Sequence, residues 1–288
     1  MLIRYGKKET KTIAITPYDY YLIYEKMIKE NTMVNLMKTT LFHFMFAHGL
    51  RTDSLNAIQI KDIVWKPLTV PIHSQYYQDS SYIIRFNLGI WISKDKARNN
   101  QYYQFVRGNL YYPDCSNVLL ILYLYFIRNA FIQNNLNEII WNGYLRMKEE
   151  KLNEWLFIKG IDDFYSNKTI AYLIQKYEKK ADISLKYSPR SFRTGIVNRW
   201  LINTMLENNQ FHNYQDEREL LTFMGWKSHD SLYYYKRQFL YQYLPNKHSH
   251  ENEPPLNHHQ ESITILPNEF EELKEQMKQD GYNTHVFF

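Results

Sequence analysis

Apolar residues recur at helical spacing through the first fifty positions. Thr16 and Pro17 mark a helix start, because a capping threonine precedes a proline at the first helical position. This helix is predicted to cover residues 17–29. A second helix is predicted from about 32 to 48, closed by Gly49, with one face buried: Val34, Met37, Leu41, Phe44 and Met45.

Alternating apolar positions predict a small β-sheet in the middle of the chain. Residues 82–93 form one expected strand and 101–107 its partner, with a polar turn at 94–100 that carries three cations. A short helix opening at Arg51 is expected to give way to extended chain over residues 58–60. These segments are short compared with the helical ones on either side.

The second half of the chain is predicted to be helical. A strongly apolar run from residue 114 or 116 to about Phe131 is too hydrophobic all round for a surface helix, so it is expected at the centre of the fold. Four further segments are predicted to be helices: 167–180, a run from about 189 onward, 217–224 and 231–243. The predicted fold class is therefore mostly α with a small antiparallel β-sheet.

The composition changes after residue 243. Residues 1–244 are predicted to form one domain, 245–263 a linker and 264–288 a segment with one more helix. That helix has an apolar stripe, formed by Phe270, Leu273 and Met277. The stripe needs a partner surface, either on a neighbouring protomer or on its own domain. No metal site is assigned to the linker, because its histidines lack Cys or acidic partners at fixed spacing: His248, His250, His258 and His259.

Composition narrows the class of protein. The 288 residues carry a net charge of +5, which permits a nucleic-acid partner without demanding one. A single cysteine, Cys115, excludes a disulfide framework and a Cys-based zinc site. The most apolar run, 118–126, is too short to span a bilayer, and no secretory signal opens the chain. The chain is therefore expected to be soluble and intracellular, with no membrane partner.

Four separated segments resemble, in order, the motifs of the tyrosine recombinases, the phage-integrase superfamily. The segments are HGLRTDSLNAIQIKDI, IWISKDKARNNQYYQFVRG, SPRSFRTG and GWKSHDSLYYY. The resemblance implies a catalytic domain of the tyrosine-recombinase type with these site residues: Arg51, Lys94, Arg190, Arg193, Trp226 and Tyr235. Lys96 is the alternative to Lys94. Within the superfamily, the chain is similar to the crypton-type recombinases of fungal mobile elements and to the related centromere-binding kinetochore subunit of budding yeasts. Two features carry that likeness: Trp226, where many members have His, and the segment VRGNLYYPDCSNVLLILYLYF.

The residue types fit the chemistry that the resemblance implies. Negative charge builds on the non-bridging oxygens of a phosphodiester under attack, and two guanidiniums, Arg51 and Arg193, would supply bidentate, permanently charged donors. Tyr235 would be the nucleophile, and a lysine on the hairpin the general acid for the leaving 5′-oxygen. Neither a metal nor another cofactor is implied. The expected partner is double-stranded DNA, bound by a homo-oligomer, in the nucleus of a eukaryote or otherwise in the cytoplasm.

Two departures from the family pattern keep other interpretations open. Arg190 stands where the family box begins with His, and a guanidinium cannot shuttle a proton near neutral pH. The short stretch before the first core helix leaves no room for the usual N-terminal DNA-binding domain, so the chain is either a fragment or a minimal catalytic domain. The alternatives are a recombinase-like module that binds DNA without cutting it, a type IB topoisomerase and an unrelated helical interaction protein. Arg51 also has an ordinary alternative role, which is to satisfy carbonyls at the end of the preceding helix.

Overall fold

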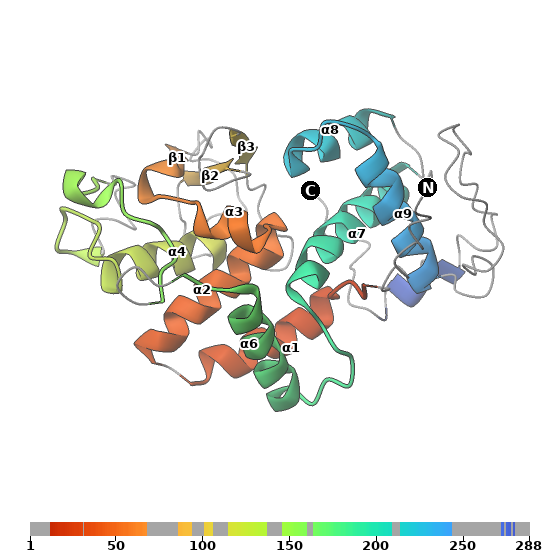
Figure 1. Ribbon diagram of the computed structural model, residues 1–288, viewed down its shortest axis with the longest axis horizontal. Coiled ribbons are helices and arrows are strands. Elements are labelled where there is room, and N and C mark those ends of the chain that lie inside the picture. Colours follow the sequence, from red (N-terminus) through yellow and green to blue (C-terminus); the bar gives the residue numbers. More distant parts are fainter. Residues whose placement is uncertain are drawn as a thin grey trace, which may run out of the picture.

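The computed structural model describes residues 12–30, 32–67, 86–93, 101–105, 115–136, 146–159, 164–208 and 214–243, and residues 272, 273, 275–277 and 279 near the C-terminus. Figure 1 shows these segments as helices around a small sheet at one edge. In chain order the elements are α1 (Pro17–Ile28), α2 (Met33–His48), α3 (Thr52–Asn56), η1 (Ile60–Asp62), β1 (Ile63–Pro67), β2 (Phe86–Ser93), β3 (Gln101–Phe105), α4 (Cys115–Phe126), η3 (Glu149–Lys151), α6 (Asn167–Lys180), α7 (Pro189–Asn208), α8 (Tyr214–Met224) and α9 (Asp230–Tyr243). The expected fold class, mostly α with a small antiparallel sheet, is confirmed.

The first two helices begin and end where their capping residues predict. Thr16 Oγ1 accepts the backbone N–H of Asp19 at 3.1 Å, and Thr32 caps α2 in the same way. Gly49 ends α2 with φ of 60°, in the left-handed region that glycine tolerates. One prediction about this helix was wrong: Val34 is 57% exposed, because it lies in the first turn, before the helix passes under its neighbours.

The sheet is antiparallel in the order β1-β2-β3, with Ile63 paired to Ile90 and Trp91 to Tyr103. The prediction of extended chain over residues 58–60 is confirmed at Gln59, which is extended and pairs with Trp155 in an isolated β-bridge, but it was wrong at Ile60, which begins the single-turn helix η1. A capping box formed by Gln59 and Asp62 holds that turn, and the strand starts only at Ile63.

The apolar helix α4 is central, as predicted, with buried residues from Leu119 to Leu124. It ends at Phe126, however, and not near Phe131. The chain turns at Asn129, which has φ of 47°, and Phe131 then pairs with Met147 in an isolated β-bridge. Hydrophobicity predicted where this segment is buried but not where its helix ends, because buried turn residues are as apolar as buried helix residues.

Buried apolar side chains form two clusters that meet inside α7. The first cluster takes its side chains from α1, α2, α4, α6 and the sheet, and it reaches α7 at Phe192. The second begins one turn later, at Ile196, and includes α8, α9 and two residues near the C-terminus, Leu273 and Met277. Figure 1 shows α7 running from α1 and α6 toward α8 and α9. The apolar residue Phe270 and the linker histidines lie outside the described residues.

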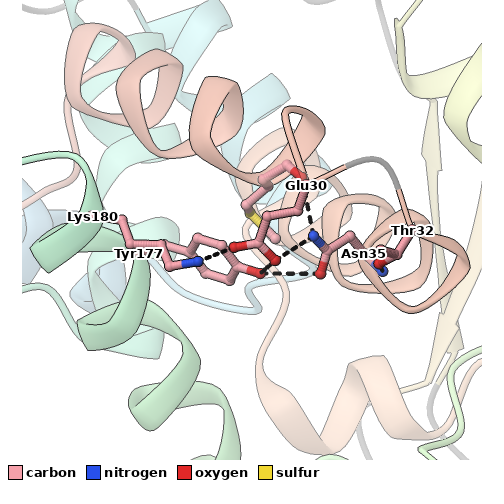
Figure 2. A network of polar contacts seen from close by, with 6 residues as sticks. Glu30, Thr32, Asn35, Tyr177 and Lys180 are labelled. Atoms are coloured by element: carbon pink, nitrogen blue, oxygen red, sulfur yellow. Dashed lines mark hydrogen bonds and ion pairs between the residues drawn. The ribbon is translucent and has the colours of Figure 1, made fainter.

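A polar network fastens the turn between α1 and α2 to α6 (Figure 2). The hydroxyl of Tyr177 donates to Glu30 Oε2 and Asn35 Oδ1, both at 3.2 Å, and Lys180 pairs with Glu30. These contacts, that of Lys180 first, lower the pKa of Glu30 to about 2. Among the described helices, none is long and apolar enough to cross a membrane.

Candidate active site

Arg193 lies in α7 between the two hydrophobic clusters and is only 5% exposed. Its Nη1 donates to the carbonyl of Gly49 at 2.8 Å, and its Nη2 donates to the carbonyl of Met224 at 3.5 Å. The guanidinium therefore joins the C-terminal end of α2 to that of α8. Satisfying a carbonyl at the end of α2 was the ordinary role considered for Arg51, and in the structure Arg193 fills it.

Arg51 is exposed and makes no capping hydrogen bond with the helix that it opens. The helix itself is anchored: Asn56 Nδ2 donates to the carbonyl of Tyr165 at 2.9 Å, and Thr52 bonds to Asn167 at the start of α6. A firm backbone thus presents a guanidinium whose donors remain available to a ligand.

Trp226 and Tyr235 stack against each other beside Arg193. Their ring centroids are 5.1 Å apart with an interplanar angle of 15°, and the Arg193 guanidinium carbon lies 5.5 Å from the Trp226 ring. Gly225, with φ of 62°, ends α8, and the N–H of Trp226 donates back to the carbonyl of Leu221 at 2.8 Å. This turn places the Trp226 indole against Tyr235 of α9.

Arg190 also contacts α9, but through Tyr234 rather than Tyr235. Its guanidinium carbon lies 4.9 Å from the ring centroid of Tyr234, an arrangement that favours the cation. The Tyr234 ring meets that of Tyr235 edge-on, with centroids 5.4 Å apart. The structure thus brings Arg190, Arg193, Trp226 and Tyr235 together, although they come from two separate segments of the sequence.

Tyr102 links Arg51 to this group. Burial raises the pKa of the Tyr102 hydroxyl, while the charge of Arg193, a hydrogen bond with Arg193 and the charge of Arg51 act in the opposite direction, so both guanidiniums lie near this hydroxyl. The ring also packs on Gly225, where an added Cβ would lie 2.7 Å from it. Sequence reasoning did not select Tyr102. The only available signal was the alternation along β3, which places residues 102 and 104 on one face.

Two hydrogen-bond donors at the centre of the group have no partner within the described part of the chain: Arg193 Nε and Trp226 Nε1, both buried. Nor does any described carboxylate form an ion pair with Arg51, Arg190 or Arg193. Burying a charge and donors without partners is costly. An anion bound at this place would supply what both groups lack.

The remaining site prediction concerns the hairpin lysines. Lys94 and Lys96 lie outside the described residues, between the end of β2 and the start of β3 in the sequence. The described residues contain no group of three or more His, Cys, Asp or Glu side chains suited to a metal ion.

No family model and no curated protein matches the sequence. Solved structures with similar folds include the XerH site-specific recombinase bound to palindromic difH substrate in a post-cleavage complex, with a TM-score of 0.49 and 11% identity over 82% of this chain and 52% of that one. The XerA recombinase gives a TM-score of 0.46 and 13% identity over 96% of this chain and 66% of that one. The Tn1549 transposon integrase in complex with transposon right end DNA gives 0.46 and 13% over 80% and 63%. The chain thus spans about half the length of the XerH chain, and its function has to be argued from the residues of the site.

Proposed function

We propose that this protein cleaves and rejoins DNA strands through a 3′-phosphotyrosine intermediate, as tyrosine recombinases do. One observation carries the proposal: the buried, unneutralised Arg193 lies against the ring of Trp226, whose indole N–H is unpaired among the described residues and whose ring stacks on Tyr235. A tyrosine close to donors for an anion is a suitable nucleophile for a phosphodiester.

The reaction exchanges one ester bond for another. The Tyr235 oxygen attacks phosphorus, a bond from that oxygen to phosphorus forms, and the bond from phosphorus to the 5′-oxygen breaks. The phenol proton leaves to solvent, and the 5′-oxygen takes a proton from a general acid, for which Lys94 is proposed and Lys96 is the alternative. Because the number of ester bonds is unchanged, rejoining needs no external energy source.

The three arginines have different parts in this scheme. Arg193, held by two carbonyls, is proposed to donate to a non-bridging oxygen with its unpaired Nε. Arg51 is exposed and can close over the same phosphate from the other side. Arg190 contacts Tyr234, so it is proposed to favour anionic charge near the tyrosines rather than to transfer a proton.

The wider assignment follows from the same proposal. The partner is double-stranded DNA, on which the protein assembles as a homo-oligomer in the nucleus or cytoplasm. The reacting unit is residues 1–244, followed by a linker, 245–263, and a C-terminal segment, 264–288. Burial of Leu273 and Met277 in the second cluster supports docking of that segment on its own chain. The identity of Trp226 supports a crypton-type or centromere-binding relative within the superfamily.

A second candidate function is DNA binding without strand cleavage, and two observations support it. Tyr235 is only 6% exposed and is packed against Trp226, and Arg190 occupies the position at which the family places a proton-transferring His. A binding module would keep the arginines for phosphate contacts and have no use for a free hydroxyl.

Covalent capture separates the two functions. We would incubate the protein with nicked duplexes of randomised sequence, labelled at the 5′ end of the nicked strand, and resolve the products on a denaturing gel. A 3′-phosphotyrosine retains the labelled strand on the protein, so wild-type protein is expected to give a slow-migrating labelled band. Sequencing the captured strands gives the preferred site.

Tyrosine variants provide the matched controls. Tyr235→Phe should abolish the labelled band and leave DNA binding intact, because one hydroxyl is lost and the ring is kept. Tyr233→Phe and Tyr234→Phe should retain the band. Wild-type protein that binds duplex DNA without ever forming the band would establish the binding module instead. Relaxation of a supercoiled plasmid that lacks the selected site would favour a topoisomerase.

A further inference from the structure

Gln104, on β3, is fully buried and uses its whole amide group to join separate elements. Its Nε2 donates to the carbonyl of His48 at 3.1 Å and to that of Phe223 at 2.8 Å. Its Oε1 lies 2.8 Å from His48 Nδ1. An amide oxygen can only accept, so the proton of the His48 ring is on Nδ1. Both N–H groups of the Gln104 amide and its oxygen are therefore engaged in hydrogen bonds.

Gln104 and Arg193 bind neighbouring carbonyls on the same two elements. Gln104 takes His48 at the end of α2 and Phe223 at the end of α8, while Arg193 takes the next residue of each, Gly49 and Met224. The two side chains thus form two parallel hydrogen-bonded links between the ends of α2 and α8, at the boundary between the hydrophobic clusters. The position of each one constrains the other, because both pull on the same two chain ends.

At the end of α8, Gln104 makes the shorter of the two hydrogen bonds. The bond of Arg193 to Met224 is 3.5 Å long, whereas Gln104 reaches Phe223 at 2.8 Å. The last turn of α8 leads directly to Gly225 and Trp226, whose ring lies against the guanidinium. Without Gln104, the separation between Arg193 and the indole would depend mainly on the longer bond.

We propose that Gln104 is a positioning residue for the strand-cleavage reaction. It fixes the end of α8 against the end of α2 and so sets how Arg193 and Trp226 converge on the phosphate. Gln104 is buried behind these groups and touches no substrate. The proposal rests on the proposed function, because it assigns Gln104 a part in that reaction.

The test compares cleavage rates on two substrates of the sequence selected from the randomised pool. One has an ordinary scissile phosphate, and the other has a methylphosphonate there, which lacks the negative charge that Arg193 would neutralise. Gln104→Met keeps the length of the side chain and removes its hydrogen bonds. Gln101→Met is the control, because Gln101 is an exposed glutamine on the same strand.

On the ordinary substrate, at saturating DNA, Gln104→Met should lower the cleavage rate constant by roughly 10- to 100-fold, as small misplacements of catalytic groups do. Its DNA affinity should stay within about twofold, because phosphate contacts at the surface dominate binding. On the methylphosphonate the loss should shrink to less than about threefold, because the group that is misplaced, Arg193, is no longer required. Gln101→Met should behave as wild type on both substrates.

Equal losses on the two substrates would overturn the proposal, since a purely structural role slows both reactions alike. Rate constants are compared rather than yields, so a partly unfolded variant does not imitate the expected result. Should Gln104→Met fail to fold, Gln104→Asn keeps the amide on a shorter side chain and is expected to show the same substrate dependence with a smaller loss. Wild-type protein inactive on both substrates would instead reject the proposed function and this role with it.

Discussion

The two hydrophobic clusters differ in what their polar side chains do. In the first cluster, several buried polar groups find partners, as in the 2.8 Å contact of Tyr20 with His43 and in the network around Glu30 in Figure 2. Others, such as His48 Nε2 and Asn56 Oδ1, have none among the described residues. At the edge of the second cluster, Arg193 Nε and Trp226 Nε1 have no partner in the described part of the chain. What distinguishes the boundary is that its two unpaired donors lie on side chains that contact each other, and one of these side chains stacks on Tyr235. Water or a ligand would have to complete such buried donors. The comparison therefore places the candidate chemistry at the boundary, where unpaired donors and a tyrosine come together.

The boundary itself is closely packed, although the clusters are distinct. A Cβ added to Gly49 would lie 2.4 Å from Ile196 Cγ2, so α2 and α7 touch at backbone distance. Within the second cluster, Lys236, the residue after Tyr235, is fully buried and pairs with Glu217 of α8. Close contact on both sides lets a bound phosphate meet groups from each cluster without a large movement.

The largest expected effect separates activity from stability at the boundary. Arg193→Met should lower cleavage by roughly 10²- to 10³-fold, the loss typical of one preorganised donor. It should leave the stability of the DNA-free protein nearly unchanged, because the loss of its hydrogen bonds to Gly49 and Met224 is offset by removal of a buried, unneutralised charge. Urea unfolding and covalent capture measure the two quantities.

Arg51→Met is the companion variant to Arg193→Met. It should lower cleavage as well, with a free energy of unfolding within about 0.5 kcal/mol of wild type, because Arg51 is exposed. A loss of several kcal/mol for Arg193→Met would contradict the comparison. Arg193 would then stabilise the fold, as the paired polar side chains of the Glu30 network do.

A second effect, smaller for each residue, concerns the histidines of α2. Burial, and then the charges of His48 and Arg199, lower the pKa of His43 to about 3, and burial lowers the pKa of His48 to about 4. Both rings are therefore neutral in the folded protein, while the unfolded chain binds protons below its ordinary pKa of about 6.5. Stability should fall as the pH drops below that value, by roughly 2 kcal/mol per histidine at pH 5.

Urea unfolding at pH 7.5 and pH 5 measures this loss. His43→Gln should remove about half of the pH dependence, since one of the two buried rings no longer takes up a proton on unfolding. A pH dependence that is unchanged in His43→Gln would show that other groups cause it.

The smallest expected effect lies in the network of Figure 2. Glu30→Gln should cost less than about 1 kcal/mol, because Glu30 and Lys180 are partly exposed and solvent screens the pair. The lowered pKa of Glu30 means that its stabilisation is present above the ordinary carboxyl pKa and is lost as the pH falls toward about 2. Glu25→Gln should change stability less, because Glu25 is similarly exposed but its contacts are with Tyr21 and Lys29, which are local to α1. A greater cost for Glu25→Gln would show that the network adds nothing to the scaffold.

The sequence by itself determined the local features of this protein. Thr16, Thr32 and Gly49 marked the ends of the first helices because capping depends on residues a few positions apart. The helix at 167–180 was predicted to the residue from its amphipathic pattern, which also repeats over a few positions. The errors at Val34 and near Phe131 arose where burial or a turn depends on neighbours that are distant in the sequence.

Only the tertiary structure decided which residues share the work of the site. Gln104 meets His48 across 56 positions and Phe223 across 119, and no local pattern encodes such a pair. The sequence predicted Arg51 and Arg193 as equivalent phosphate ligands, but their surroundings differ. Arg51 is exposed, whereas Arg193 is buried and bonded to the ends of α2 and α8. Residue type sets what a side chain can donate, and packing sets whether those donors are spent on the fold or kept for a ligand.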